Sequence, residues 1–465
     1  MITDRCRAGR MTIDVFSDDE LINIFNAYRR GSEHYWQDFF WPWKTLTHVC
    51  QRWRRIVFAS PHHLDVRVDC ESITHVTKIS DIWPGLPVGI WPTRRHKYGD
   101  IIAIALEHRH RDHIARISLP DLTKSRLERC TALMQGPYPV LRYLSLSCCE
   151  DPPVITDAFL GGSAPCLQSI ILSRIPFPTL PKFLLSVNNL VELQLKEITS
   201  AGYISPEVMA TCLAMLARLQ SFVILFKSTE SFPSRKGDNN PSLPRIVLPA
   251  LTEFEFAGIC EYLEHLLVRF DASLLDKLTL RFFHEPTFDV PQLPQFIHGT
   301  ERFKAATDIE VHFDHDELRV YVHLPQPVDG NFLLIFERRG LDGQLSLLGE
   351  VCTQCFFFSH ANRLEFFRRG GPIPDQQNSE LWLGFLRPFK AAQILYFSDE
   401  EIEVQIARVL GELRGESVAE VLPMLHTLAL KRRCRVEPLV TPLLKPFIDA
   451  RQLWSRPVAV DWISL

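Results

Sequence analysis

The sequence predicts an α/β fold in which a small helical module is followed by a curved array of short parallel strands and helices. Three observations predict it: a capped helical stripe near the N-terminus, an apolar triplet that recurs along most of the chain, and helical stretches between the triplets. The chain has 465 residues, of which 46% are apolar and 23% are charged. This length is too great for one ordinary core, so we expect two or three domains or one extended repeat array.

The first predicted helix begins at the sequence SDDE, residues 17–20, which has the pattern of a capping box. Ser17 can accept a hydrogen bond from the amide of Glu20, and the Glu20 carboxylate can accept one from the amide of Ser17. The apolar residues that follow have helical spacing and predict an amphipathic helix. They are Leu21, Ile22, Phe25 and Tyr28.

A second helix is predicted to start near Trp43, after an aromatic-rich segment, and to end at Ser60-Pro61. Its apolar residues follow the i, i+3, i+4, i+7 rule. They are Leu46, Val49, Cys50, Trp53, Ile56 and Val57. Apolar stripes of this kind most often pack on each other, so a small structural domain is the simplest interpretation of the two helices.

The two helices in this order resemble the F-box. Residues 16–25 are similar to its opening, L-P-x-[DE]-[ILV]-L-x-x-I-[FL], and residues 46–56 are similar to its second half, L-x-x-V-C-x-x-W-x-x-[IVL]. The chain departs from the family at Ser17, where a proline is usual, and in the longer gap between Phe25 and Leu46. The resemblance covers roughly the first 65 residues.

The resemblance implies that the module binds the Skp-type adaptor of a cullin–RING ubiquitin ligase through apolar side chains. Some of the matching residues must instead form the module's own core, and the sequence does not separate the two sets. The residues that the resemblance assigns to adaptor binding are Phe16, Leu21, Ile22, Phe25, Leu46, Val49, Cys50 and Trp53.

The pattern L-x-x-L-x-L recurs through the rest of the chain, at intervals of 23 to 32 residues in its seven clearest copies. A leucine-rich repeat has a similar period, with a short strand and a helix or turn in each unit. The clear copies begin at Ile114, Leu141, Leu167, Leu190, Leu219, Leu251 and Leu275, and the weaker ones at Ala306, Ala361, Ala392 and Leu425. One degenerate unit is expected near residues 318–334. The alternative is an ordinary α/β domain in which leucines recur by chance.

Helices are predicted between the triplets, and three polar or proline-bearing segments are predicted to be exposed loops. Ser205 is the expected N-cap of one helix, which has proline in its first turn. The predicted helices are 180–190, 206–219, 261–270 and 399–413, and the predicted loops are 228–244, 285–299 and 370–380.

The expected domain organisation is a disordered N-terminus (1–11), an F-box-like module (12–65), a connecting segment (66–110) and an irregular repeat array (111–465). This combination resembles the F-box and leucine-rich-repeat proteins that are abundant in basidiomycete fungi. The first residues contain no apolar stretch typical of a signal peptide, so we expect a cytoplasmic or nuclear protein. The net charge of −4 predicts no nucleic-acid partner, and the short apolar runs predict no membrane partner.

No catalytic motif is recognisable, so we predict no catalytic residue, cofactor or metal. The pairs Cys352/Cys355 and Cys148/Cys149 are interpreted as buried apolar cysteines. The histidines of EHRHRDH (residues 107–113) and the basic run KRRCR (residues 431–435) are interpreted as exposed turns.

The sequence therefore predicts a non-catalytic substrate receptor, which joins a Skp-type adaptor and its cullin to an unknown protein substrate bound by the array. The alternative is a leucine-rich-repeat scaffold with no ubiquitin role, whose N-terminal helices only cap the array. A helix-turn-helix that binds nucleic acid is a third and weaker possibility.

Overall fold

The structure is a computed structural model that describes residues 13–31, 42–59, 68–69, 87–90, 111–233, 245–283, 290–304, 307–324, 331–369, 379–431 and 440–463. The chain divides into two compact units, Met1–Glu150 with Asp157–Leu167 and Asp151–Thr156 with Gln168–Leu465. The predicted disordered N-terminus, the aromatic-rich segment at 32–41 and most of the connecting segment lie outside the described residues.

The first unit begins with a helical module. Its elements are η1 (Ile13–Val15), α1 (Asp18–Gly31), α2 (Pro42–Val49) and α3 (Gln51–Ala59). The predicted capping box is confirmed, because the Ser17 amide donates to Glu20 Oε2 (2.7 Å) and the Glu20 amide donates to Ser17 Oγ (3.2 Å).

The single second helix that we predicted is divided into α2 and α3 at Cys50. The cause is local: hydrogen bonds to Cys50 start a new helix at this residue. Its Sγ accepts from the Trp53 amide (3.4 Å), and its carbonyl accepts from the Arg54 amide (3.0 Å). A side chain that accepts from the amide three residues on is the usual arrangement at a helix N-terminus.

The rest of the first unit is a parallel sheet. β2 pairs with β1 on one side and β3 on the other, and β3 pairs with β4, all in parallel. β1 and β2 lie in the range that we expected to be only a connection, so the sheet begins before the first triplet. The elements are β1 (Val68–Asp69), β2 (Val88–Ile90), η2 (Arg111–His113), β3 (Ile114–Leu122), α6 (Lys124–Leu133), β4 (Tyr143–Cys148) and η3 (Phe159–Gly162).

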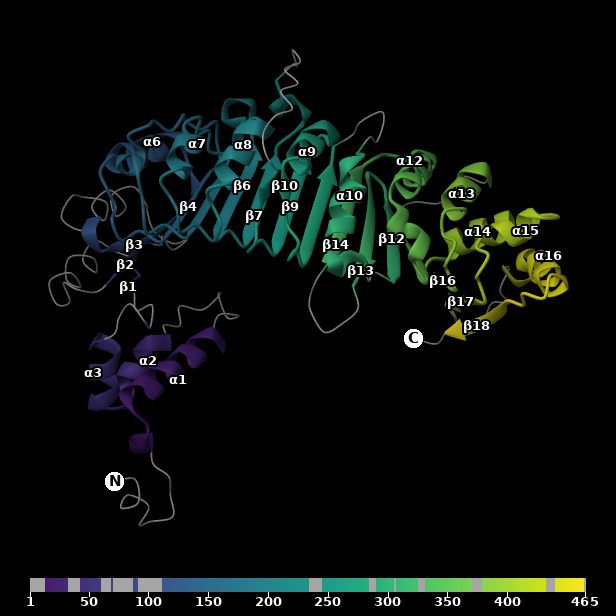
Figure 1. Cartoon of the computed structure of the whole chain (residues 1–465), viewed down its shortest axis with the longest axis horizontal. Coiled ribbons are helices and arrows are strands. Elements are labelled where there is room, and N and C mark those ends of the chain that lie inside the picture. The colour runs from purple at the N-terminus through teal and green to yellow at the C-terminus, as the bar shows by residue number, and fades with distance from the viewer. Residues whose placement is uncertain are drawn as a thin grey trace, which may run out of the picture. The chain divides into compact units, whose positions relative to one another are not determined.

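The second unit opens with five parallel strands in the order β5-β6-β7-β9-β11. Figure 1 shows α7, α8 and α9 along one side of these strands. The strands are β5 (Ser169–Ser173), β6 (Glu192–Ile198), β7 (Ser221–Phe226), β9 (Glu253–Gly258) and β11 (Lys277–Phe282), and the connecting helices are α7 (Leu180–Leu184), η4 (Ser200–Gly202), α8 (Pro206–Leu213), η5 (Thr229–Ser231) and α9 (Cys260–Leu267). A separate parallel pair is formed by β8 (Ile246–Val247) and β10 (Phe270–Asp271).

The triplet prediction is confirmed in these strands. The second triplet residues are register partners on successive strands, and the third residues continue the same buried face. Ser205 is the N-cap of α8, where its Oγ accepts from the Val208 amide (3.4 Å). The buried second-position residues are Ile170, Leu193, Phe222, Phe254 and Leu278.

The middle of the second unit departs from a parallel array. The strand order is β11-β14-β13-β12-β15, and β13 is antiparallel to both of its neighbours. The degenerate parallel unit that we predicted near 318–334 is therefore wrong. His315 and Asp316 alone join β12 to β13, and a two-residue connection permits only antiparallel pairing. The elements are α10 (Gln292–Gly299), α11 (Glu301–Lys304), β12 (Asp308–Asp314), β13 (Glu317–His323) and β14 (Asn331–Glu337).

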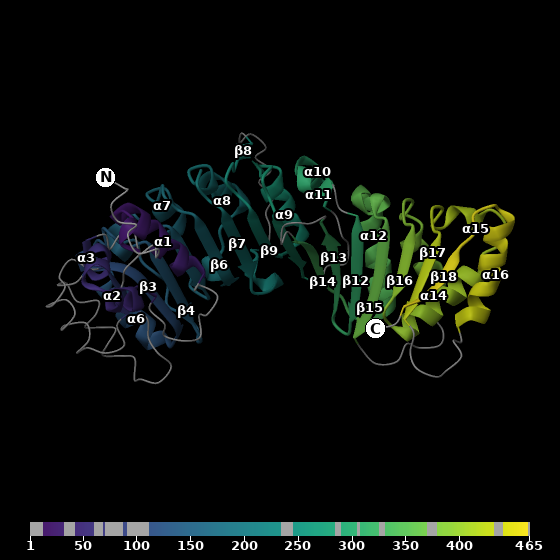
Figure 2. The same ribbon diagram turned by 90° about the horizontal axis from the view of Figure 1, so that it is seen from below.

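The last part returns to parallel pairing, in the order β12-β15-β16-β17-β18. Figure 2 shows these strands side by side. The elements are α12 (Leu341–Gln354), η6 (Phe356–His360), β15 (Arg363–Arg369), α13 (Ser379–Leu386), β16 (Ile394–Phe397), α14 (Glu400–Glu412), α15 (Ser417–Glu420), β17 (Thr427–Lys431), α16 (Val440–Leu453) and β18 (Ala459–Ile463).

One predicted loop is a helix. The segment 285–299 was expected to be exposed, yet α10 occupies its second half and buries Leu293, Phe296 and Ile297. These residues have the i, i+3, i+4 spacing of a helix face, which outweighs the prolines nearby. Residues 234–244 and 370–378 of the other two predicted loops lie outside the described residues.

Candidate protein-binding surfaces

Part of the apolar set that the sequence assigned to adaptor binding forms the core of the helical module. Leu21 and Phe25 from α1 are 0% and 1% exposed, and they pack with Leu46 from α2 and with Ile56 and Val57 from α3. A charge placed on any of these side chains would be buried without a partner, which is strongly unfavourable.

Two residues lie at the margin of this core. The Trp53 ring packs against the Phe25 ring with a centroid distance of 4.6 Å, and Trp53 and Ile22 are both partly buried. Each therefore packs against the core while part of its side chain remains exposed.

Other apolar residues of the module are open to solvent. Phe16 is 37% exposed, Val49 is 55% exposed, and Cys50 is exposed. Ile24, which was not among the residues assigned to adaptor binding, is 40% exposed and flanks the buried stripe of α1. Its spacing from Tyr28, four residues on and equally exposed, could have identified this second stripe from the sequence.

Arg52 fixes the segment that carries Phe16. Its Nη2 donates to the Phe16 carbonyl (2.7 Å) and to Asp18 Oδ1 (2.7 Å), and its Nε also donates to Asp18 (3.0 Å). An exposed ion pair adds little to stability, but these bonds place Phe16 beside the first turn of α3. Val49 and Cys50 immediately precede that turn, so Phe16 lies at the same end of the module as the α2–α3 junction.

The predicted set is thus divided by burial. Leu21, Phe25 and Leu46 form core, Ile22 and Trp53 are partly buried, and Phe16, Val49 and Cys50 are exposed. We call Phe16, Ile24 and Val49 the exposed apolar set. Their contact with an adaptor stays a prediction.

The strands of the second unit present a second candidate surface, the face opposite the buried triplet residues. Polar side chains on neighbouring strands bond to each other there, for example Ser221 Oγ to Glu253 Oε2 (2.9 Å) and Lys277 Nζ to Glu253 Oε1 (2.5 Å). Burial disfavours ionisation of Glu253, but its bonds to Lys277 and Ser221 outweigh this effect and lower the pKa of its carboxyl. At these positions the face is therefore polar and charged, as expected of a surface that meets solvent or a partner.

A group of five side chains on this face lies on β12, β13 and β15. Glu310 contacts His312 Nε2 through one oxygen and His323 Nε2 through the other, the second at 3.0 Å. The His312 ring stacks on the Phe367 ring (4.6 Å between centroids) and packs against the Tyr321 ring (4.9 Å). We call these five residues the Glu310 cluster.

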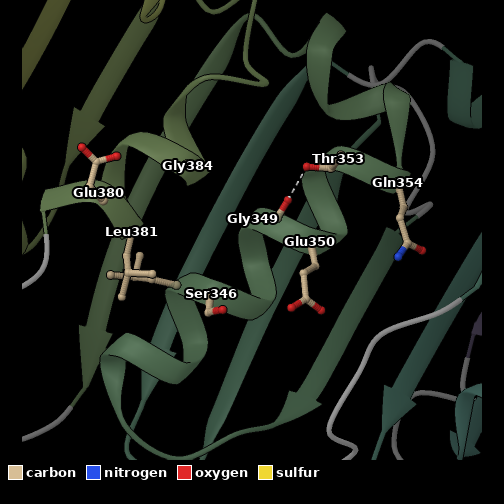
Figure 3. A pocket seen from close by; sticks show the side chains of 9 residues that line it. Ser346, Gly349, Glu350, Thr353, Gln354, Glu380, Leu381 and Gly384 are labelled. Atoms are coloured by element: carbon tan, nitrogen blue, oxygen red, sulfur yellow. Dashed lines mark hydrogen bonds between the residues drawn. The ribbon is translucent and has the colours of Figure 1, made fainter.

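An open groove lies on the helical side, between α12 and α13 (Figure 3). The two helices approach each other at Gly349, where a Cβ would lie 3.8 Å from the Gly384 carbonyl carbon, an ordinary van der Waals distance. Glu350 and Glu380 border the groove, and the Thr353 hydroxyl donates back to the Gly349 carbonyl (2.7 Å). The Thr353 hydroxyl is thus hydrogen-bonded within α12. The groove itself is small and is lined by both polar and apolar residues.

The cysteine interpretation is largely confirmed. Cys352 and Cys355 are buried free thiols, and burial raises the pKa of Cys355 to about 12 and that of Cys352 well above its usual value. Cys148 is buried as expected, but Cys149 is exposed because it follows the end of β4, where its Sγ contacts the Leu122 carbonyl (3.4 Å).

No group of three or more His, Cys, Asp or Glu side chains within the described ranges is arranged to hold a metal ion. His113 lies in η2, whereas His108 and His110 and the basic residues 432–435 lie outside the described residues. Among the helices that the structure describes, none combines the length and the apolar character required to cross a bilayer.

Comparison with known proteins gives little further information. No protein family matches the chain, and no curated protein is similar to it. Among solved structures, the chain is similar to the leucine-rich repeat-containing protein LegL7 from Legionella pneumophila, at 11% identity over 85% of this chain and 99% of that one, with a TM-score of 0.26. The description of this chain as a mixed α/β repeat protein therefore depends on its own strand order and triplet positions.

Proposed function

We propose that this chain is a substrate-recognition subunit of a cullin–RING ubiquitin ligase. In this proposal the helical module docks on a Skp-type adaptor, and the repeat array binds a protein substrate. The observation that carries the proposal is the exposed apolar set of the module, which remains outside a core that is already closed by Leu21, Phe25 and Leu46. Large apolar side chains that stay exposed beside a closed core are candidates for a protein interface.

The exposed apolar set also distinguishes docking from capping. A helical cap shields the end of a repeat array and needs a polar outer surface to remain soluble. Phe16 and Val49 would contribute nothing to such a cap, whereas they suit the apolar centre of an interface. The exposed positions thus favour the docking role over the scaffold with capping helices.

The proposal assigns no chemical step to the chain itself. A receptor of this kind promotes ubiquitin transfer by holding the substrate near a separately bound conjugating enzyme, which raises the effective concentration of substrate lysines. The polar face of the strands in the second unit is the proposed substrate-binding surface.

The adaptor half of the proposal is tested by substitutions in the exposed apolar set. Val49→Asp and Ile24→Asp, made in the full chain, should each weaken capture of a purified Skp-type adaptor by roughly thirtyfold, the effect of losing about 2 kcal/mol at an interface centre. Binding is measured by titration with the adaptor, and far-ultraviolet circular dichroism reports whether the helices persist.

Gln51→Asp is the matched control, because Gln51 is an exposed polar residue beside Val49. It adds the same charge to the same end of the module and should bind the adaptor like the unmodified chain. Unchanged adaptor affinity in both apolar variants, or no binding by the unmodified chain, would refute the docking role.

A further inference from the structure

The Glu310 cluster joins two strands through one carboxylate. His312 lies on the same strand as Glu310, whereas His323 lies on β13, where its register partner is Asp308. The contact between His323 and Glu310 therefore crosses the β12–β13 hairpin diagonally, within reach of long side chains. Because an ionised carboxylate only accepts hydrogen bonds, both imidazoles donate to it.

The protonation states of Glu310 and His323 favour a contact between two charged groups. Bonds from His312 and then His323 lower the pKa of the Glu310 carboxyl to about 2, so Glu310 is ionised at any ordinary pH. The bond to Glu310 raises the pKa of His323, against the opposing effect of its partial burial, and the charges of Asp308 and Glu365 act in the same direction as Glu310. His323 thus keeps its proton to a higher pH in the folded chain than in the unfolded one.

The other charged groups near His323 act on it more weakly than Glu310 does. On β13, Arg319 is paired with Glu317, and on β15, Arg363 Nη2 is paired with Glu365 (2.8 Å). From β14 the register partner of His323 is Asn331, which carries no charge. The charged side chains that share this face on β12, β13 and β15 are Asp308, Asp314, Glu317, Arg319, Arg363 and Glu365.

The direction of the pH effect follows from the raised pKa. A group whose pKa is higher in the folded state stabilises that state fully below its unfolded pKa, about 6.5 for histidine, and loses this contribution as pH rises through the folded pKa. The hairpin is therefore held most firmly at mildly acidic pH and less firmly at alkaline pH.

We propose that the contact between His323 and Glu310 is a pH-sensitive device that controls how firmly the β12–β13 hairpin is held in the sheet. Protonated His323 fixes β13 to β12, and loss of that proton loosens the one antiparallel strand between the two parallel blocks. Since this hairpin contributes to the face that we propose for substrate binding, the device would regulate that binding, and this part rests on the proposed function.

The device is tested on the full chain by hydrogen exchange measured with mass spectrometry. Exchange in peptides that cover 308–323, corrected for the intrinsic effect of pH, reports local opening of the hairpin. Protection should fall about two- to fivefold between about pH 6 and about pH 9, the size expected for a half-exposed charge pair. Peptides from β6 and β7 should show no comparable fall.

Two substitutions isolate the contact. Glu310→Gln removes the carboxylate that both imidazoles share, so most of the fall in protection with rising pH should disappear, while Asp308 and Glu365 keep a smaller effect. His323→Lys keeps a positive charge over the whole range, so protection should remain high at alkaline pH. His315→Gln is the control, because His315 lies in the turn of the same hairpin and its pair with Asp316 is exposed on both sides.

The proposal is overturned if Glu310→Gln keeps the full pH dependence, or if His323→Lys loses protection at alkaline pH as the unmodified chain does. These readouts involve no adaptor or substrate. A failure here therefore leaves the docking proposal standing, and a failure of adaptor binding leaves the hairpin device standing.

Discussion

Leu21 and Val49 are both aliphatic residues of the helical module, but only Leu21 is inside it. Leu21 packs with Phe25 and Leu46 in the closed core, whereas Val49 ends α2 with most of its side chain in solvent. The same chemical character thus has two consequences: at Leu21 it stabilises the fold, and at Val49 it is available to a partner.

Truncation of the two residues should therefore have different effects on stability. Leu21→Ala leaves a cavity in a small core and should destabilise the module by about 3 kcal/mol. Val49→Ala removes an exposed side chain and should change stability by less than about 0.5 kcal/mol. Hydrogen exchange in peptides covering 18–59 measures both variants, and equal losses of protection would contradict the division into core and surface.

Helical spacing could predict which residues of the module are apolar and helical, but not how they divide between core and surface. Leu46, Val49 and Cys50 fit one stripe on a continuous helix. Because the backbone instead starts a new helix at Cys50, Val49 and the residues of α3 no longer share one face. The division depends on hydrogen bonds at Cys50 that periodicity does not report.

At the scale of elements, two helix glycines show how closely helices approach in the second unit. A Cβ on Gly411 of α14 would lie 2.2 Å from the Leu443 carbonyl oxygen of α16, so this contact requires glycine. A Cβ on Gly384 of α13 would have no neighbouring atom within 4 Å. One glycine therefore sets a helix–helix distance, and the other has no such role.

Alanine substitutions should separate these two glycines. Gly411→Ala forces α16 away from α14 and should destabilise the unit by about 1–3 kcal/mol. Gly384→Ala gains helix propensity without a clash and should stabilise it by about 0.5 kcal/mol. Thermal unfolding measures both, and a stabilising Gly411→Ala would show that α14 and α16 do not pack in this way.

Helix positions were largely predictable where a cap and an apolar stripe coincide, as at Ser205 and α8 or at Asp399 and α14. Asp399 Oδ1 accepts from the amides of Glu401 (3.1 Å) and Ile402 (3.2 Å), which is the arrangement that its sequence favours. α10 was missed because its prolines outweighed a short stripe. Close approaches such as that of Gly411 depend on residues remote in sequence, and no local pattern indicates them.

At the scale of the second unit, β13 is the connection between two parallel blocks. On one side of it lie β5, β6, β7, β9, β11 and β14, and on the other lie β12 and β15 to β18. Its inward residues Leu318, Val320 and Val322 are all buried. Both blocks therefore depend on one reversed strand for their continuity.

A buried charge on β13 should open the unit at this point. Val320→Asp should reduce hydrogen-exchange protection across β12, β13 and β14 far more than in β6 or β17, because an unpaired buried carboxylate costs several kcal/mol. Val320→Ala should give the same pattern in weaker form. Uniform loss of protection over the whole unit would instead indicate a single cooperative core.

The parallel array was predictable and the reversal was not. The alternation of Ile309, Val311 and Phe313 is the same whether a strand pairs in parallel or antiparallel, since side chains alternate in both. The only local evidence of reversal is the two-residue connection His315-Asp316, which lacks the glycine or asparagine of a typical hairpin turn. The sequence thus predicted where the strands lie and which of their faces are buried, but it did not predict the direction in which each strand runs.

The reversed strand also limits how such an array can gain or lose units. In the parallel blocks, one strand with its helix can be removed and the neighbouring strands can pair in the same direction. Removal of β13 alone would leave β12 and β14 pointing the same way with only a short link, whereas a parallel pair needs a crossover of about a dozen residues. The reversed strand therefore cannot be deleted by itself without redesigning the connections around it.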